Sequence, residues 1–327
     1  MKFRKLLAVA GIAAWSAISA HAASPSYPDS ARSISVVVPF GPGSGTDVIT
    51  RIITADMSKE LGGASIIVVN KPGANGLIGA EYAARATPDG YTLLVATNST
   101  NSANPWLFQK LPYDPRKDFA PIGLMTINPL ALLVKHGSPF RTPADLVDYA
   151  KKHPGKLSYG YGNTGGQVAA AMLLHMADIN ATAVPYKTTP QLFTDLINGQ
   201  VDFGFVDFAA SRPMIDGGQL NSLATTSEEQ LSFASSMPTM KKTPGLDQFN
   251  LYAWLGLMAP AGTSPEIVER LNVALNRSLN KPDVKKQLEN QTSSVLKPMT
   301  TPEFQNFLAE QSELWKRRIQ DAGIKPQ

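Results

Sequence analysis

Cysteine is absent from this chain of 327 residues, and histidine is scarce, with four residues. The absence of cysteine excludes disulfide bonds, thiolate catalysis, lipid attachment through cysteine and cysteine-based zinc sites. No H-x-x-x-H spacing supports a histidine zinc site either. His136 and His153 fall in turns and His175 inside a predicted helix, where a surface or packing role is the simplest interpretation. We therefore predict no metal site and no cysteine chemistry.

Complete signatures of hydrolases and nucleotide-binding enzymes are also lacking. Gly43-Ser44-Gly45 does not have the G-x-S-x-G spacing of a nucleophile elbow, and Gly155-Lys156 lacks the Ser or Thr of a Walker A loop. The segment from Gly160 to Gly165 matches G-x-G-x-x-G, but the next strand ends Val184-Pro185-Tyr186, without the acidic residue that holds a ribose hydroxyl. We predict no catalytic residue and no cofactor. An NAD-type dinucleotide-binding oxidoreductase or an exported hydrolase is the alternative.

Residues 1–22 have the organisation of a cleaved signal peptide. Lys2, Arg4 and Lys5 precede an apolar stretch that is too short to span a bilayer, and Ala20-His21-Ala22 fits an A-x-A cleavage site. We expect export to the periplasm and a mature chain that begins at Ala23 or one residue later. Removal of the three cations lowers the formal net charge from +4 to +1. No Lys/Arg-rich run remains, so nucleic acid is not an expected partner.

The length and the pattern of the mature chain predict two lobes. About 300 residues exceed what one core usually serves, and strand-like runs alternate with helical patterns, which is typical of α/β architecture with largely parallel sheets. We expect residues 26–125 and 253–327 to form lobe 1 and residues 126–252 to form lobe 2, each with its own sheet. The apolar run 65–69 is predicted to be a strand covered on both faces. Two chain crossings, near Met125–Asn128 and Tyr252–Gly256, would make a hinge beside a ligand cleft.

Two strand-to-helix junctions predict anion cradles, one in each lobe. In the first, strand 34–38 leads through a glycine-rich turn into a helix that opens at Thr46-Asp47; in the second, strand 157–161 leads through residues 162–166 into a helix from Gln167. The first amides of a helix lack internal partners and carry partial positive charge, and glycine lets the backbone approach a ligand closely. The alternative is an ordinary capped turn, because Ser44-x-x-Asp47 fits a variant of the capping box.

Polar and aromatic residues near other strand ends complete the predicted site. Asp207 ends a strand, where open α/β sheets place ligands, and could bind an amino group, a hydroxyl or a water; its alternative role is a helix N-cap. A polar loop follows the strand that ends near Ala96. The predicted ligand-binding residues are Phe40, Gly41, Gly43, Ser44, Gly45, Thr46 and Asp47 in the first turn, Thr97, Asn98, Ser99 and Asn101 in the polar loop, and Gly162, Asn163, Thr164, Gly165, Tyr186 and Asp207 in lobe 2.

A set of short motifs, in this order, resembles one known family. The motifs are V-P-F-G-P-G at 38–43, V-N-K-P-G-A-N-G at 69–76, P-D-G-Y-T-L-L at 88–94, D-F-A-P-I at 118–122, V-P-Y-K at 184–187, N-G-Q-V-D at 198–202, M-P-T at 237–239 and W-L-G-L-M-A-P at 254–260. Together they resemble the Bug or TctC-type periplasmic solute-binding proteins of tripartite tricarboxylate transporters, over nearly the whole mature chain.

The resemblance implies a two-lobed type II periplasmic-binding-protein (Venus flytrap) fold and a protein that is not an enzyme. It implies a small organic carboxylate as ligand and inner-membrane subunits of a tripartite tricarboxylate transporter as partners, and we expect a monomer. The sensor domain of a transcription regulator can share this fold, but it needs a DNA-binding helix-turn-helix where this chain has a signal peptide. Gly43-Ser44-Gly45, Gln167 and Thr188-Thr189-Pro190 depart from the family pattern, which leaves the identity of the carboxylate open.

Overall fold

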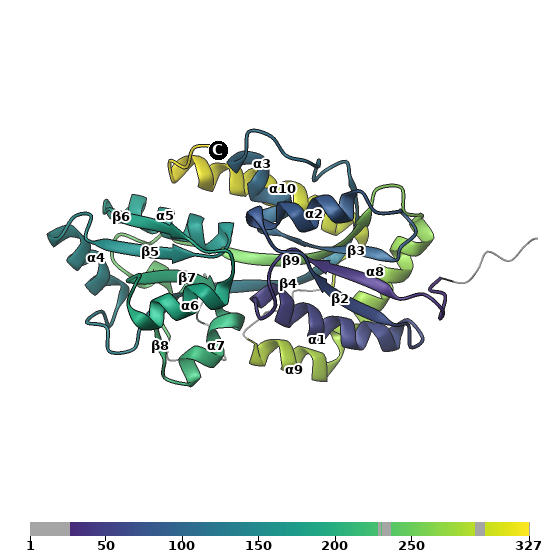
Figure 1. Ribbon diagram of the computed structural model, residues 1–327, viewed down its shortest axis with the longest axis horizontal. Coiled ribbons are helices and arrows are strands. Elements are labelled where there is room, and N and C mark those ends of the chain that lie inside the picture. Colours follow the sequence, from purple (N-terminus) through teal and green to yellow (C-terminus); the bar gives the residue numbers. More distant parts are fainter. Residues whose placement is uncertain (1–26, 228–229, 231–236, 292–297, 327) are drawn as a thin grey trace, which may run out of the picture.

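A computed structural model describes residues 27–227, 230, 237–291 and 298–326 of the chain. The expected signal peptide and residue 26 lie outside these ranges. The described residues form two α/β lobes that lie side by side (Figure 1). The described chain begins on lobe 1 and ends beside lobe 2. The predicted α/β class and two-lobed organisation are therefore confirmed.

Lobe 1 is built on a mixed sheet, which differs from the expected largely parallel one, because β9 (Tyr252–Pro260) and β4 (Phe119–Lys135) pair antiparallel. Strand β1 (Ile34–Val38) pairs in parallel with β2 (Ile66–Asn70) and β3 (Thr92–Thr97), and β3 pairs antiparallel with β9. Apolar side chains of β1 and β3 pack with those of α1 and α8 in one buried cluster, which forms the lobe's main core. The helices of this lobe are α1 (Gly45–Glu60), α2 (Leu77–Ala84), α3 (Asn104–Leu107), α8 (Pro265–Asn280) and α9 (Pro282–Asn290).

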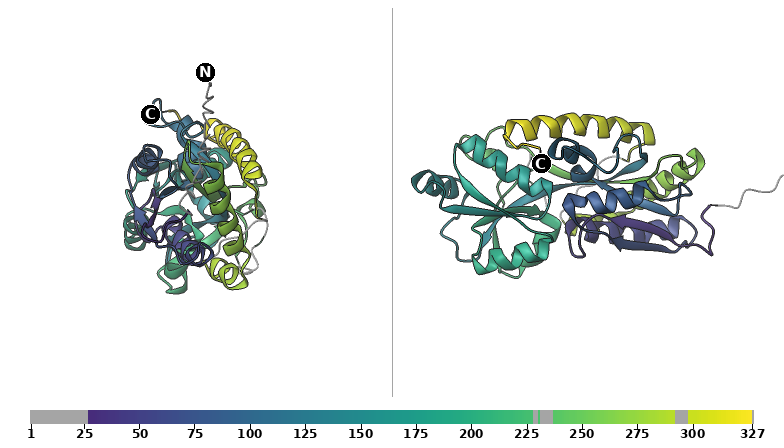
Figure 2. Two further views of the ribbon diagram at one scale, coloured as in Figure 1. Left: turned by 90° about the vertical axis from the view of Figure 1, so that its right-hand side faces the viewer. Right: turned by 45° about the horizontal axis from the view of Figure 1, so that its top comes forward.

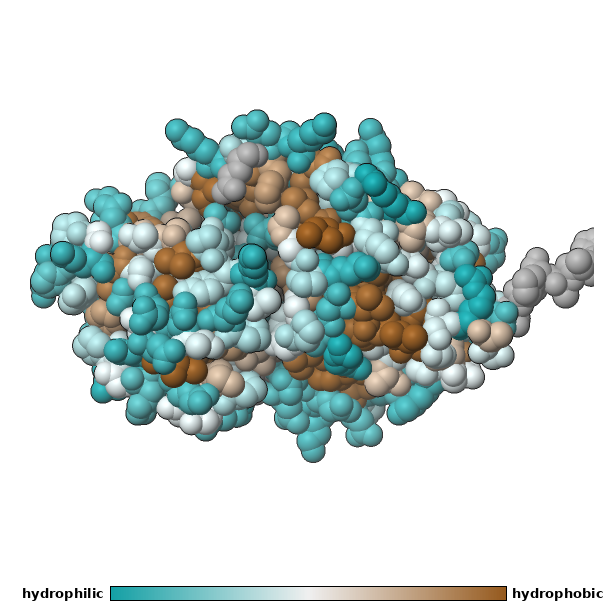
Figure 3. Space-filling view, in the orientation of Figure 1, coloured by the Kyte–Doolittle hydropathy of each residue, from teal (hydrophilic) through white to brown (hydrophobic). Residues whose placement is uncertain are grey.

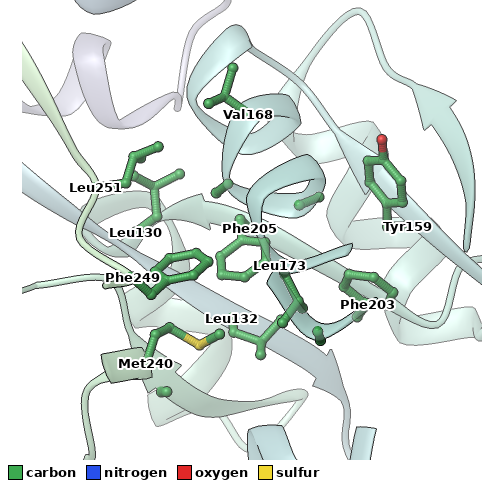
Figure 4. Close-up of a cluster of buried hydrophobic side chains, with 14 of the residues drawn as sticks. Leu130, Leu132, Tyr159, Val168, Leu173, Phe203, Phe205, Met240, Phe249 and Leu251 are labelled. Atoms are coloured by element: carbon green, nitrogen blue, oxygen red, sulfur yellow. The ribbon is translucent and has the colours of Figure 1, made fainter. Parts of the chain in front are cut away.

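Lobe 2 repeats this design with its own core. Strand β5 (Leu157–Tyr161) pairs in parallel with β6 (Ala181–Pro185) and with β7 (Phe203–Asp207). Phe205 of β7 stacks on Phe249 with ring centroids 5.8 Å apart, inside the apolar cluster of Figure 4. The remaining elements are α4 (Pro143–Lys152), α5 (Thr164–Ala177), α6 (Thr189–Asn198), α7 (Phe208–Asp216) and β8 (Leu220–Thr225).

One long strand joins the two sheets, which differs from the expectation of a separate sheet in each lobe. Strand β4 (Phe119–Lys135) has 17 residues; its first part, to Pro129, pairs with β9, and its last part, from Leu130, pairs with β7 and β8. The hydrogen-bond ladder is thus continuous through β4. Register shifts after Pro121 and Leu124 allow the strand to bend between the lobes. Both expected crossings, near 125–128 and 252–256, lie where β4 and β9 run side by side.

The last helix also connects the lobes. Helix α10 (Thr301–Asp321) lies across both of them (Figure 2). At its start, Phe304 packs edge-on against Trp254 in lobe 1, whereas Trp315 and Ile319 belong to the buried cluster of lobe 2. The lobe boundaries given above remain a prediction.

The expectation that the strand around 65–69 is covered on both faces is wrong. Strand β2 is an edge of the sheet, its residues are only partly buried, and the Ile67 side chain is 49% exposed. Because a short apolar run does not specify a strand's place in a sheet, the sequence pattern could not separate an edge strand from a central one.

Candidate functional site between the lobes

The turn before α1 is held together by Asp47, whose carboxylate points back into lobe 1. Asp47 accepts hydrogen bonds from the Gly43 amide, from Arg51 Nε and from Asn70 Nδ2, each at 3.0 Å. Burial alone would raise the pKa of Asp47, but these hydrogen bonds outweigh it and hold the pKa below its usual range. Ser44 caps the helix by accepting from the Asp47 amide. Asp47, predicted to contact ligand, therefore serves to position the turn.

The first turn of α1 leaves two backbone amides without a protein acceptor. Among the described residues, neither the Gly45 nor the Thr46 N–H donates a hydrogen bond, because the cap satisfies only the amides that follow. These donors lie at the positive end of the helix dipole. The predicted anion cradle of lobe 1 is thus present as unpaired donors at the lobe junction.

The start of α5 in lobe 2 has the same arrangement. Asn163 caps this helix by accepting from the Gly166 amide at 2.9 Å. The amides of Thr164 and Gly165 donate to no acceptor within the described part of the chain. The helix begins at Thr164, earlier than the predicted start near Gln167, so both amides belong to its first turn.

Asp207 lies at the end of β7 and faces lobe 1. Its carboxylate does not cap α7, although the residue stands at the N-cap position. Instead Oδ2 accepts from Asn163 Nδ2 at 3.2 Å, and a Cβ on Gly45 would be only 2.9 Å from the Cβ of Asp207. The residue is 8% exposed. Burial raises the pKa of Asp207 to about 6, against a smaller opposite effect of the Asn163 hydrogen bond.

Two further contacts join the lobes beside Asp207. A Cβ on Gly165 of lobe 2 would lie 3.4 Å from Asn98 Nδ2 of lobe 1, and a Cβ on Gly41 would lie 3.3 Å from Thr188 Cγ2. The starts of α1, α5 and α7 and the Asn98 amide therefore meet at one place. We call this place the interlobe junction; it comprises Gly41, Gly45, Thr46, Asn98, Asn163, Thr164, Gly165 and Asp207.

A cleft of about 490 Å³ opens next to the interlobe junction. The surface is hollowed between the two lobes in the view of Figure 3. Of the predicted site residues, Phe40, Gly162 and Tyr186 line the cleft, and the Tyr186 hydroxyl donates to Asp195 at 2.8 Å. Burial, and then Asp195, raise the pKa of Tyr186 to about 12, so this hydroxyl is neutral. Apolar walls and few polar groups are typical of small-molecule sites.

The turn at residues 73–76 forms one wall of the cleft, although it was not among the predicted ligand-binding residues. Gly73, Ala74, Asn75 and Gly76 have successive positive φ values of 128°, 47°, 54° and 84°. For Ala74 this conformation costs about 1–3 kcal/mol, and such strain is concentrated at functional sites. The signal was available in the run P-G-A-N-G, because glycine and asparagine tolerate positive φ. Leu107, Phe108, Gln167, Pro185 and Lys187 also line the cleft and were not among the predicted residues.

Several predicted residues lie away from the cleft. Thr97 caps a buried π-helical segment, Asn98–Ala103, in which Thr100 and Thr97 accept from each other's amides; a polar loop was expected here. Ser99 is buried in the same segment. Asn101 lines a different cavity, beneath α10, and donates to Met258 Sδ. Gly43 is exposed with φ 77°, and a Cβ there would have no other atom within 4 Å, so the backbone conformation explains this glycine.

The structure also accounts for the features that suggested an enzyme. Gly160 of the G-x-G-x-x-G match is required by packing, because a Cβ there would collide with Leu192 Cδ1. His136, His153 and His175 are all exposed. Within the described ranges, no group of acidic or histidine side chains could hold a metal ion. In the same ranges, no helix has both the length and the apolar character that a membrane crossing requires.

Comparison with known proteins gives a consistent assignment. Residues 49–324 match the model of the tripartite tricarboxylate transporter family receptor, TctC. Protein BugT of Bordetella pertussis is 30% identical over 332 residues, covering 99% of both chains. Among solved structures, R. palustris Rpa4515 with adipate is 29% identical with a TM-score of 0.88, covering 92% of this chain and 100% of that chain. MatC (Rpa3494) from Rhodopseudomonas palustris with bound malate is 32% identical with a TM-score of 0.82, covering 88% and 99%.

Proposed function

Because the chain belongs to the tripartite tricarboxylate transporter receptor family, the Bug or TctC-type solute-binding proteins, we propose that it captures a small organic carboxylate between its lobes. The family resemblance inferred from the motifs is thereby confirmed. Capture takes place in the periplasm, and the loaded protein delivers its ligand to the membrane subunits of a transporter of this type. The protein acts as a receptor and not as an enzyme.

The observation that carries this proposal is the pairing of two helix starts across the interlobe junction. Gly45 and Thr46 present free amides from lobe 1, and Thr164 and Gly165 present free amides from lobe 2. A carboxylate between them could accept four hydrogen bonds. Charge-assisted hydrogen bonds contribute about 1.5–3 kcal/mol each, and micromolar affinity needs about 8 kcal/mol, so no ion pair with Arg or Lys is required.

The same arrangement links binding to closure of the lobes. Because each pair of amides belongs to a different lobe, a bound carboxylate bridges them and favours the closed form over the open one. The two crossing strands supply the hinge on which the lobes separate. A transporter can then distinguish the loaded protein by the relative position of its lobes.

The cleft next to the interlobe junction has room for the rest of a small ligand. Its volume of about 490 Å³ falls within the usual range for small-molecule sites. Two relatives in the family have been solved with adipate and with malate, both of which are compact carboxylates. The aromatic side chains of Phe40, Tyr161 and Tyr186 would cover the apolar part of the ligand.

A thermal-shift panel on the purified mature protein tests this function. The panel contains mono-, di- and tricarboxylates, amino acids and aromatic acids, each beside its amide or alcohol analogue without the carboxylate. We expect at least one carboxylate to raise the melting temperature, and its analogue to have no effect. Stabilisation by neutral analogues alone, or by no member of the panel, would contradict the proposal. N-terminal sequencing of periplasmic protein checks the expected cleavage after Ala22.

A further inference from the structure

Asp207 presents a carboxylate that its own lobe satisfies only in part. At the N-cap position a carboxylate normally accepts from the first amides of its helix, but Asp207 makes no such bond to α7. One oxygen, Oδ2, accepts from Asn163. The only other hydrogen bond to the carboxylate among the described residues comes from the residue's own backbone amide. Because a carboxylate has about four acceptor sites, acceptor capacity is left for a ligand.

No positive side chain neutralises this carboxylate among the residues that the structure describes. Helix α1 presents Gly45, and the nearest charged residue on that helix, Asp47, is paired with Arg51 and points the other way. Helix α5 presents the neutral Asn163 amide, and β4 presents Leu130 at the position paired with Asp207. Ser211 of α7 donates only to the Asp207 backbone carbonyl. The carboxylate thus faces neutral groups on every packed element.

A ligand carboxylate at the interlobe junction would come next to the Asp207 carboxylate. Two neighbouring carboxylates repel each other, and in a buried site the repulsion is weakly screened. A ligand avoids this cost if it carries a positive group beside its carboxylate. A hydroxyl beside the ligand carboxylate would supply a hydrogen bond to Asp207. It would still leave two carboxylate charges side by side with no cationic group between them.

The geometry points to Asp207 as the residue that selects the ligand: we propose that the bound carboxylate carries an adjacent ammonium group, as in an α-amino acid, and that this group pairs with Asp207. This inference rests on the proposed capture of a carboxylate at the interlobe junction. The carboxylate of the ligand takes the free amides of α1 and α5, and the ammonium pairs with the Asp207 carboxylate. With a pKa of about 6, Asp207 is mostly ionised at neutral pH, as this pairing requires.

Calorimetry with matched ligand pairs tests the selection. Each pair differs only in the α-ammonium group: aspartate and succinate, glutamate and glutarate, leucine and 4-methylpentanoate, phenylalanine and 3-phenylpropionate. We expect the best-binding pair to favour the amino acid by about tenfold or more in Kd at pH 7.5. In Asp207→Asn the preference should fall below about threefold. Asp202→Asn removes a carboxylate at the other end of β7, where it bonds Ser158, and should leave the preference unchanged.

The wild-type protein gives a second readout that needs no variant. Acidification from about pH 7.5 to about pH 5 protonates Asp207. It should weaken the binding of the amino acid and strengthen the binding of the matched acid without the ammonium group. Equal or better binding of the partner by the wild type at pH 7.5 would overturn the selection role. An unchanged preference in a folded Asp207→Asn protein would also overturn it. If no member of any pair binds although another carboxylate stabilises the protein in the thermal-shift panel, the selection role fails and the proposed function stands. If no carboxylate binds in either experiment, the proposed function itself fails, which is a separate result.

Discussion

Two aspartates lie near the interlobe junction, each where a strand passes into a helix: Asp47 in the first turn of α1 and Asp207 at the N-cap of α7. Asp47 in lobe 1 receives three hydrogen bonds, including one from Arg51, and its pKa is lowered. Asp207 in lobe 2 receives a single side-chain hydrogen bond, from Asn163, and its pKa is raised to about 6.

The comparison shows that the partners of a carboxylate decide its role more than its place in the chain does. Both residues were expected to contact ligand. Asp47 is fully engaged by its own lobe and fixes the shape of the turn, whereas Asp207 has fewer partners in its lobe. The same residue type is thus structural in lobe 1, and in lobe 2 it is the residue that we propose to bind ligand.

The strongest perturbation of this arrangement is expected at Gly45. A Cβ at this position would lie 2.9 Å from the Cβ of Asp207, so the lobes of Gly45→Val could not close as they do here. We expect calorimetry to show a loss of about a hundredfold or more in affinity, equivalent to about 2.7 kcal/mol. Ala55→Val is the matched control, because it places a valine on the exposed side of the same helix. Equal affinities of Gly45→Val and the wild type for the carboxylate would contradict binding at the interlobe junction.

Replacing the structural aspartate should lower stability. Asp47→Ala removes an acceptor from Gly43, Arg51 and Asn70, and hydrogen bonds to a charged group contribute about 1.5–3 kcal/mol each. We expect the free energy of unfolding in urea to fall by about 3 kcal/mol at neutral pH. Because the folded pKa is lowered, this stabilisation is present above the ordinary pKa of 3.8 and is lost as the pH falls through the folded value. A pH-independent difference would show that the carboxylate charge is not involved.

Replacing the available aspartate should have the opposite effect. The folded pKa of Asp207 is about 6 against an ordinary value of 3.8, so the folded state binds more protons between these values and loses stability as the pH rises through them. Above about pH 6 the penalty approaches about 3 kcal/mol. Asp207→Asn should therefore be more stable than the wild type near pH 7.5 and equal to it near pH 4. Urea titrations at the two pH values measure the free energy of unfolding. A variant less stable than the wild type at pH 7.5 would contradict the contrast between Asp47 and Asp207.

The smallest effect is expected from the lysines nearest to the cleft. Lys71 Nζ lies 4.0 Å from the centroid of the Tyr82 ring, and Lys187 lines the cleft with an exposed side chain. If backbone amides hold the carboxylate, Lys71→Met and Lys187→Met should each change Kd by less than about threefold. A hundredfold loss from either variant would mean that a point charge holds the ligand.

Much of the fold could be predicted from local patterns. The strands 34–38 and 157–161 have the predicted bounds, because turn residues delimit each run. Helices α4, α8 and α10 have Thr142, Ser264 and Thr300 as caps, each followed by a proline at the first or second helical position, which is a strong start signal. These features depend on residues close together in the chain.

Features that depend on distant residues could not be predicted in this way. The role of Asp47 is set partly by Asn70, 23 positions further along the chain, and no local pattern connects the two. The polar segment from Asn98 to Ala103 is buried because α10 packs over it from the other end of the chain. Likewise, β4 joins the two sheets because partners from both lobes meet it in space.

A crystal structure of the protein with its best-binding carboxylate tests the central claim most directly. The account predicts a ligand carboxylate within about 3.0 Å of an amide nitrogen of Gly45 or Thr46 and of one from Thr164 or Gly165. A ligand held instead by Lys187 in the outer cleft, with these amides still free or bonded only to water, would contradict it.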